Sequence, residues 1–321
     1  MKRMILSLFV LSLFLFAAAQ AGAQVKLTVG KAVAKTFEFI PVDIGVEQGF
    51  FQKRGLDVKI LSFPGGARLA AALAAGSVDI AQDAAVGIIA AVGKGSPGKL
   101  VALIGDKPHL MVMIGGKESG IKTKEDLKGK KVGVTSHGAL TDWLVKRVEE
   151  VMGWPKDSIT RVPLGGFTGQ VAGLRTRAID GFVWSADGGW DIEEKGLGKI
   201  LFSFGEILPG IAFEAIEAHN KLIRENPKAL KAFLEGWYES VKYMKANKDY
   251  TIKKIAAILG VSPEVARRTY ELDIGNLSED GVIPRASLDY IIKSHVTDGL
   301  FPSPPDIKAV YNDEFVPVRL R

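Results

Sequence analysis

Residues 73–83 have the sequence LAAGSVDIAQD, and residues 174–184 repeat its pattern as LRTRAIDGFVW. In each copy a helix end, a turn and a short apolar strand follow one another, and the strand closes on a polar or aromatic residue. A Gly-Gly pair precedes both copies: 14 residues separate Gly65 from Asp79, and 15 separate Gly165 from Asp180. This similar spacing favours a true duplication over the alternative that any α/β domain has glycine-rich turns and Leu/Val strands.

The similarity extends further upstream in both copies. Residues 58–66 match residues 159–166, and the apolar run 27–30 corresponds to 131–134. Each copy therefore has the order strand, Gly-Gly turn, helix and strand, which predicts two α/β lobes with parallel sheets covered by helices on both faces. Ligands of such sheets bind beyond the carboxyl ends of the strands, so the repeated turns would surround one cleft.

The first residues of the chain are different in kind. Lys2 and Arg3 precede an apolar run over residues 4–19, and Ala-Gly-Ala follows at residues 21–23. This order predicts a secretory signal peptide at residues 1–23, whose cleavage after Ala23 would release a periplasmic protein. The alternative, an uncleaved membrane anchor, would need a longer apolar span of about 20 residues.

Composition excludes several classes of protein. The chain has 321 residues, of which 47% are hydrophobic, so it can form a sizeable core and two domains. It has no cysteine, which excludes disulfides, a thiolate metal site and a Cys nucleophile. The formal net charge is +6, and because the basic residues are spread along the chain, no nucleic-acid partner is expected.

One segment carries a resemblance to a known family. Residues 47–58, EQGFFQKRGLDV, are followed by a Gly-Gly turn and by the AL..G.VDIA pattern of residues 72–81. This order resembles the substrate-binding proteins of ABC importers for nitrate, sulfonates, taurine and thiamine-pyrimidine precursors. The resemblance runs from about residue 27 to residue 204. It implies the type II periplasmic binding protein fold, in which two doubly wound α/β lobes are joined by two crossover strands and close over a small molecule.

The resemblance suggests how the chain divides. We expect lobe I to comprise residues 24–112 and 215–321, and lobe II to comprise residues 113–214, with crossover strands at 109–114 and 211–216. Apolar residues recur at helical spacing after Pro227 and predict a long amphipathic helix whose apolar face packs in the core. Residues 255–270 have the helix, turn and helix of a DNA-binding motif. An exported protein meets no DNA, so we expect an ordinary helical hairpin there.

The cleft should be lined by the turns that follow the strands. In lobe I these turns contribute the ligand-binding candidates Thr36, Phe37, Gly65, Gly66, Asp83 and Ala84. The two glycines would let main-chain N–H groups approach a ligand at the start of a helix, where the helix dipole favours negative charge. The alternative is that the paired glycines only make a tight turn from strand to helix.

Lobe II offers two further groups of ligand-binding candidates, which are Ser136, His137, Gly138 and Thr141 in one turn and Trp184 and Asp187 in the other. Ser136 is a candidate N-cap, and the N–H groups after it could bind an anionic oxygen, while His137 has the alternative role of a surface loop residue. Trp184 stands where its strand should enter the cleft. Its ring could stack on a flat ligand or, alternatively, pack under the next helix.

Asp83 departs from the family pattern, which has a small or hydroxyl residue at this position in many relatives. A carboxylate there would repel an anion unless it is neutralised, or it would pair with a basic, amine-bearing ligand. With Trp184, Phe37 and His137 expected nearby, the sequence favours an organic ligand with a ring or acyl body and a polar end over nitrate or a simple sulfonate.

The resemblance implies a monomeric periplasmic receptor that captures a small organic molecule, with an anionic or aromatic group, and delivers it to an ABC permease. No catalytic site, cofactor or metal is expected, because no paired catalytic carboxylates, HExxH motif or Ser-His-Asp spacing stands out. One alternative is a binding protein that signals to a membrane partner. Another is an enzyme similar to the thiamine-pyrimidine synthase, which relies on pyridoxal phosphate, iron and a cysteine-rich motif that this chain lacks.

Overall fold

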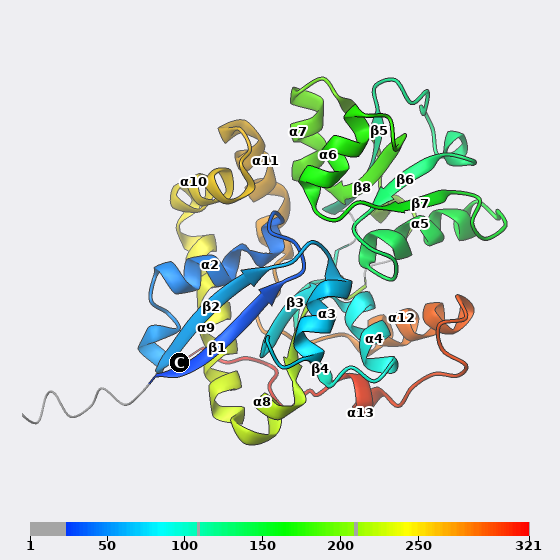
Figure 1. Ribbon diagram of the computed structural model, residues 1–321. Coiled ribbons are helices and arrows are strands. Elements are labelled where there is room, and N and C mark those ends of the chain that lie inside the picture. Colours follow the sequence, from blue (N-terminus) through cyan, green and yellow to red (C-terminus); the bar gives the residue numbers. More distant parts are fainter. Residues whose placement is uncertain (1–23, 108–109, 209–210, 321) are drawn as a thin grey trace, which may run out of the picture.

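The computed structural model describes residues 24–107, 110–208 and 211–320, and the predicted signal peptide at residues 1–23 lies outside them. Two five-stranded mixed sheets form the framework, one in each of two lobes, and helices pack around both (Figure 1). This arrangement confirms the predicted fold class of two α/β lobes. Within the described ranges, no helix is both long enough and apolar enough to span a membrane.

The two sheets have the same plan, with strand orders β2-β1-β3-β10-β4 and β7-β6-β8-β5-β9. The strands of the first are β1 (Val25–Lys31), β2 (Leu56–Ser62), β3 (Ile80–Ala84), β4 (Gly98–Gly105) and β10 (Glu214–His219). Those of the second are β5 (Met111–Gly116), β6 (Lys131–Val134), β7 (Thr160–Pro163), β8 (Gly181–Ser185) and β9 (Gly198–Ser203). In each sheet three parallel strands are followed by one antiparallel strand, β10 or β5.

The chain passes between the sheets twice, between Gly105 and Met111 and between Ser203 and Glu214. After each passage it enters the new sheet as the antiparallel strand, since β5 pairs with β8 and β9, and β10 pairs with β3 and β4. The predicted lobe boundaries, after residues 112 and 214, fall inside β5 and at the first residue of β10. Each of these strands pairs within one sheet, and the position of the lobe boundaries stays a prediction.

The helices fill the connections between strands. They are α2 (Ile40–Glu47), α3 (Gly66–Ala74), α4 (Ala85–Gly93), α5 (Leu140–Val151), α6 (Phe167–Arg175), α7 (Ala186–Glu194), α8 (Asn220–Glu225), α9 (Pro227–Ala246), α10 (Lys248–Leu259), α11 (Pro263–Asp273), α12 (Arg285–Thr297) and α13 (Ile307–Val310). Short 3₁₀ turns are η2 (Phe37–Phe39), η3 (Gln52–Arg54), η5 (Glu125–Leu127), η6 (Phe204–Glu206) and η7 (Ile274–Asn276). The long helix predicted after Pro227 is confirmed as α9. The predicted hairpin is α10 and α11, and α11 contacts α7 of the other lobe (Figure 1).

The two copies of the repeat fold alike. In lobe I the Asp79 carboxylate accepts a hydrogen bond from the Thr28 N–H at 2.7 Å. In lobe II the Asp180 carboxylate accepts one from the Lys131 N–H at 2.8 Å. These bonds align Thr28 with Lys131, so the sequence match of residues 27–30 with 131–134 is wrong by one position.

The corrected alignment makes Gly30 and Gly133 equivalent, and both leave room for a helix. A Cβ on Gly30 would lie 2.2 Å from a methyl carbon of Leu69 in α3, and a Cβ on Gly133 would lie 2.1 Å from Oε1 of Gln170 in α6. Both distances are far inside van der Waals contact. Glycine in the middle of β1 and β6 therefore lets α3 and α6 pack directly on their sheets.

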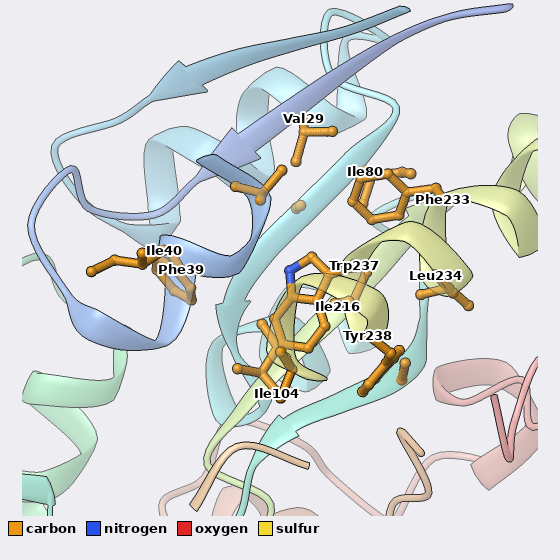
Figure 2. Packing of buried hydrophobic residues seen from close by; sticks show 14 of the residues in the cluster. Val29, Phe39, Ile40, Ile80, Ile104, Ile216, Phe233, Leu234, Trp237 and Tyr238 are labelled. Atoms are coloured by element: carbon orange, nitrogen blue, oxygen red, sulfur yellow. The ribbon is translucent and has the colours of Figure 1, made fainter. Parts of the chain in front are cut away.

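The core of lobe I supports one of the strands that reach the cleft. Trp237 and Phe233 of α9 are fully buried against β1, β3 and β10 (Figure 2). The Trp237 indole N–H donates to Gln82 Oε1 at 2.8 Å, and this hydrogen bond holds the buried Gln82 side chain of β3 in place. Full burial of a large apolar side chain stabilises a fold by about 1.5–3 kcal/mol. Asp83 directly follows Gln82 in β3. The packed core of lobe I therefore also fixes the position of Asp83 at the cleft.

Candidate ligand-binding site

A cavity of about 50 Å³ lies between the lobes, at the carboxyl ends of their parallel strands. Lobe I lines it with Ala32, Val33, Thr36, Phe39, Gly66, Asp83, Ala84 and Glu214; lobe II lines it with Met111, Thr135, Ala139, Leu140, Thr141, Trp184 and Ser185. Sites for small molecules commonly measure roughly 300–1,000 Å³. In the present arrangement the cavity has room for only a few atoms.

Half of the predicted ligand-binding residues form the wall of this cavity. They are Thr36, Gly66, Asp83, Ala84, Thr141 and Trp184. Phe37 instead lies fully buried in the lobe I core, and Asp187 is buried outside the cavity wall. Gly65 sits where the lobes meet, since a Cβ on it would lie 3.2 Å from Ser136 Oγ. The part these residues play in binding stays a prediction.

The turn at residues 136–138 differs from its predicted form. Helix α5 begins at Leu140 with Ala139 as its N-cap, so the prediction that Ser136 is the N-cap is wrong. The turn at Gly138, with φ of 79°, separates Ser136 from the helix. The Gly138 N–H donates to the Asp142 carboxylate at 3.0 Å, and His137 Nδ1 lies 3.3 Å from the same carboxylate. An internal negative charge thus occupies the place where the sequence suggested an anionic ligand.

Asp142 is itself neutralised by neighbours. Arg161 Nε lies 2.9 Å from one of its oxygens, and Lys146 Nζ lies 3.2 Å from the other. Although burial opposes ionisation, the Gly138 N–H and the nearby cations together lower the pKa of Asp142 below its ordinary value. The start of α5 is therefore a satisfied ion-pair network with little attraction left for a further anion.

Equivalent positions of the two lobes face each other across the cavity. Glu214 is paired with Ala84 at the start of β10, and Met111 is paired with Ser185 at the start of β5. Since β3 and β8 are equivalent strands, Glu214 corresponds to Met111, and Asp83 corresponds to Trp184. Lobe I thus contributes two carboxyl groups where lobe II contributes a thioether and an indole.

The carboxyl groups of the lobe I wall are poorly compensated. Asp83 accepts a hydrogen bond from the Ala84 N–H at 2.8 Å, and burial raises the pKa of Asp83 to about 7. Glu214 is more isolated, because its Oε2 is buried without a hydrogen-bond partner. Burial first, and then the charges of Glu38 and Asp83, raise the pKa of Glu214 well above its usual range. None of the described residues that line the cavity is basic.

Further buried carboxyl groups surround this wall. Glu38 accepts a hydrogen bond from the Thr36 hydroxyl, and burial raises the pKa of Glu38. Burial, together with the nearby Glu38, also raises the pKa of Asp187 to about 7 and that of Asp273 well above its usual value. In the described part of the chain, no three His, Asp or Glu side chains are grouped so as to hold a metal ion. The arrangement concentrates negative charge beside the cavity without forming a metal centre.

Trp184 has a second contact besides the cavity. Its ring lies 5.3 Å from that of Phe167, centroid to centroid, and only 4% of the residue is exposed. The next helix is α7, and a Cβ on its Gly188 would lie 2.4 Å from Trp184 Cδ1, so the ring also packs under that helix. The ring thus contacts α6 and α7 and lines the cavity, and its part in binding stays a prediction.

Glu214 and Met111 were not predicted from the sequence. Both stand at the start of an antiparallel strand, whereas the predicted site residues follow parallel strands. One signal was present for Glu214, because it is the only charged residue in the run IAFEAI at residues 211–216. A carboxylate inside an apolar run is rarely buried without a reason.

Comparisons with known sequences agree with this architecture. The model of the family described as NMT1/THI5 like matches residues 36–250. A Brucella abortus protein named as a candidate binding protein is 27% identical over 285 residues, which cover 84% of each chain.

Solved structures show the same fold. The ligand-binding component of an ABC-type import system from Staphylococcus aureus, solved with zinc bound, has a TM-score of 0.76 at 16% identity, over 91% of this chain and 98% of that one. The alkanesulfonate-binding protein SsuA from Xanthomonas axonopodis pv. citri, bound to MOPS, has a TM-score of 0.74 at 19% identity, over 90% and 99%. At these identities the likeness extends to the fold alone, which is that of ABC-type binding proteins.

Proposed function

This chain belongs to the NMT1/THI5-like family of ABC-type periplasmic ligand-binding proteins, and we propose that it captures a small organic molecule between its lobes and delivers it to an ABC import permease. The mature protein would begin at Gln24 and act in the periplasm, as a monomer. No reaction is assigned to the site.

The observation that supports this function best is the cavity itself. Both lobes line it, and its wall comes from the ends of β1, β3, β6 and β8. Its volume of about 50 Å³ is too small for an organic ligand in the present closed arrangement. Ligand entry would therefore require opening at the two chain passages between the sheets, and closure over the ligand would create the form that the permease recognises.

A thermal-shift screen of the mature protein tests ligand capture. The panel would contain small amines, sulfonates, carboxylates, nitrate and pyrimidines. A ligand present at about one hundred times its dissociation constant should stabilise the protein by about 2.7 kcal/mol, which raises the melting temperature by several degrees. If no compound of a broad panel shifts the melting temperature of protein purified by unfolding and refolding, the receptor function is contradicted.

Trp184 provides the matched test of the site. Trp184→Phe keeps most of the packing against Phe167 but shortens the ring that faces the cavity, so it should weaken binding while the unliganded melting temperature changes little. Trp154→Phe is the control, because Trp154 lies outside the cavity wall and packs against Lys128 of its own lobe. Delivery is tested separately, by uptake of the labelled ligand in cells with and without the gene. Equal uptake with and without the gene would mean that the protein binds its ligand but serves a partner other than an import permease.

A further inference from the structure

The two lobes present opposite chemistry to one ligand. Lobe I contributes the carboxyl groups of Asp83 and Glu214, and lobe II contributes Trp184 and Met111 at the equivalent places. A ligand that spans the cavity would meet the two carboxyl groups among apolar residues of lobe I, and the indole and thioether among hydroxyl and apolar residues of lobe II. The asymmetry therefore suggests both the charge of the ligand and its orientation.

We propose that the ligand is a small organic cation, a protonated amine or amidine on an apolar or aromatic body. Its cationic group lies against Asp83 and Glu214 of lobe I, and its body lies against Trp184 and Met111 of lobe II. This assignment rests on the proposed function, since it names the substrate class of the same site.

Glu214 gives the strongest support for a cationic ligand. It is about nine-tenths buried, lines the cavity, and has an Oε2 atom without a hydrogen-bond partner. A buried polar atom left unsatisfied costs stability, and one that lines a cavity can gain its partner from a bound molecule. A group with N–H donors and positive charge would satisfy this oxygen and the free oxygen of Asp83 together.

An anionic ligand fits the same wall poorly. No Lys, Arg or His is among the described residues that line the cavity, so no basic side chain there would offset a negative charge. At the start of α5, which also lines the cavity, the carboxylate of Asp142 already takes the Gly138 N–H and the charges of Arg161 and Lys146. An anion would be desolvated beside two acids without a basic side chain to pair with.

Lobe I also makes room for Asp83 itself. A Cβ on Gly66 would lie 2.4 Å from Asp83 Oδ2, so glycine at this position lets the Asp83 carboxyl sit in the cavity wall. On the other side, Phe167 and Gly188 hold the Trp184 ring, since a Cβ on Gly188 would lie 2.4 Å from it. An aromatic or alkyl body can pack on a ring fixed in this way.

The test compares matched compounds that differ only in charge. The protein is titrated calorimetrically with benzylamine and benzamidine, with the neutral benzyl alcohol, and with the anions benzoate and benzenesulfonate, and the same charge series is repeated on cyclohexyl and butyl bodies. Binding at least tenfold tighter for the cations than for the neutral compounds supports the proposal. Binding by anions or neutral compounds at least as tight overturns it but leaves the receptor function standing. Absence of binding throughout overturns both.

Two isosteric variants locate the cationic group. Glu214→Gln should weaken cation binding at least tenfold and leave the neutral analogue unchanged, whereas Glu217→Gln should change neither by more than twofold. Glu217 is the matched control, because it is a buried carboxyl on the same strand that does not line the cavity. Equal effects of the two variants would overturn the assignment. The melting temperature of each unliganded variant shows that it is folded.

A pH series gives a readout independent of mutation. Cation binding requires ionised acids, so the affinity should increase as the pH rises from 6 to 8, with protons released on binding. The titratable groups on the elements packed around Asp83 and Glu214 are the carboxyls of Glu38, Asp187, Glu217 and Asp273 and the ion pair of Lys31 with Asp43. Affinity that falls over this range would contradict a cationic ligand.

Discussion

Arg177 has a φ of 58° at the position in lobe II that Gly76, with a φ of 72°, occupies in lobe I. Each residue comes two positions after the helix of its repeat, α6 or α3. Both copies thus need a left-handed residue to turn from helix to strand, but only the first has glycine there. A residue with a Cβ pays about 1–2 kcal/mol for this conformation.

Arg177→Gly should therefore raise the free energy of unfolding by about 0.5–1 kcal/mol, because the strain removed exceeds the entropy that glycine adds to the unfolded chain. The exposed ion pair of Arg177 with Glu118 contributes little to offset this gain. Arg175→Gly is the control, since Arg175 is an exposed residue inside α6 and glycine there should destabilise. Urea unfolding measures both, and a loss of stability in both variants would contradict the prediction.

The paired aspartates of the repeat give a second prediction. Asp79→Ala and Asp180→Ala should each lower the free energy of unfolding by about 1–3 kcal/mol, because each leaves a strand N–H without its acceptor. The two losses should add in the double variant, since the residues lie in different lobes and share no partner. Chemical unfolding of the two single variants and the double variant measures this. Losses that do not add would contradict the prediction and would mean that the two sites interact or that the lobes unfold in separate transitions.

The repeat explains how much of the fold could be predicted. A turn and a strand that recur with the same aspartate predict two similar lobes, and the structure confirms them. The alignment of the first strands was wrong by one residue because both runs are short and apolar, so only the hydrogen bonds from Thr28 and Lys131 fix their register. Hydrophobicity alone cannot fix the register of strands that are mostly buried.

The candidate site was predictable only in part, for a physical reason. Asp83 and Trp184 follow parallel strands, and the rule that ligands bind at carboxyl ends predicts them. Glu214 and Met111 reach the same cavity from strands that enter antiparallel, after the chain has crossed from the other sheet. That contribution depends on sheet order, which a single sequence does not specify. Phe37 faces the core because the chain enters a 3₁₀ turn at that residue.

The buried carboxyl groups predict an unusual dependence of stability on pH. Burial raises the pKa of Asp83 and Asp187 to about 7 and that of Glu217 to about 8, so the folded state retains protons that the unfolded state releases above about pH 4. Stability should therefore fall as the pH rises from about 4.5, up to about pH 7 for Asp83 and Asp187 and up to about pH 8 for Glu217. Burial lowers the pKa of His295, which opposes this trend only below about pH 6.5.

Glu217→Gln isolates one of these groups. The variant should gain stability of roughly 2–4 kcal/mol at pH 8 and little at pH 4.5, because glutamine cannot ionise. Glu225→Gln on the exposed surface of α8 is the control and should leave the profile unchanged. The melting temperatures of the unliganded wild-type protein and of both variants, measured from pH 4.5 to 8, test this prediction. A gain that is the same at both pH values would show that packing, and not ionisation, sets the effect.

We expect contacts between α11 and α7 to stabilise the closed arrangement of the two lobes. The Arg268 guanidinium lies 4.2 Å from the centroid of the Trp190 ring, and the Ser262 hydroxyl donates to Glu194 at 2.9 Å. These contacts join the C-terminal helices to lobe II and would be lost when the lobes separate. A cation–π contact at a partly exposed site contributes about 0.5–1 kcal/mol.

Arg268→Ala should therefore shift the unliganded protein toward the open form, with a larger radius of gyration in small-angle X-ray scattering and a two- to fivefold weaker ligand affinity. Arg267→Ala provides a matched control one residue earlier, because Arg267 pairs with Glu264 and Glu271 of its own helix. The same change in both variants would mean that loss of charge on α11, and not loss of the contact with Trp190, alters the equilibrium. No change in either variant would mean that α11 and α7 do not hold the lobes closed.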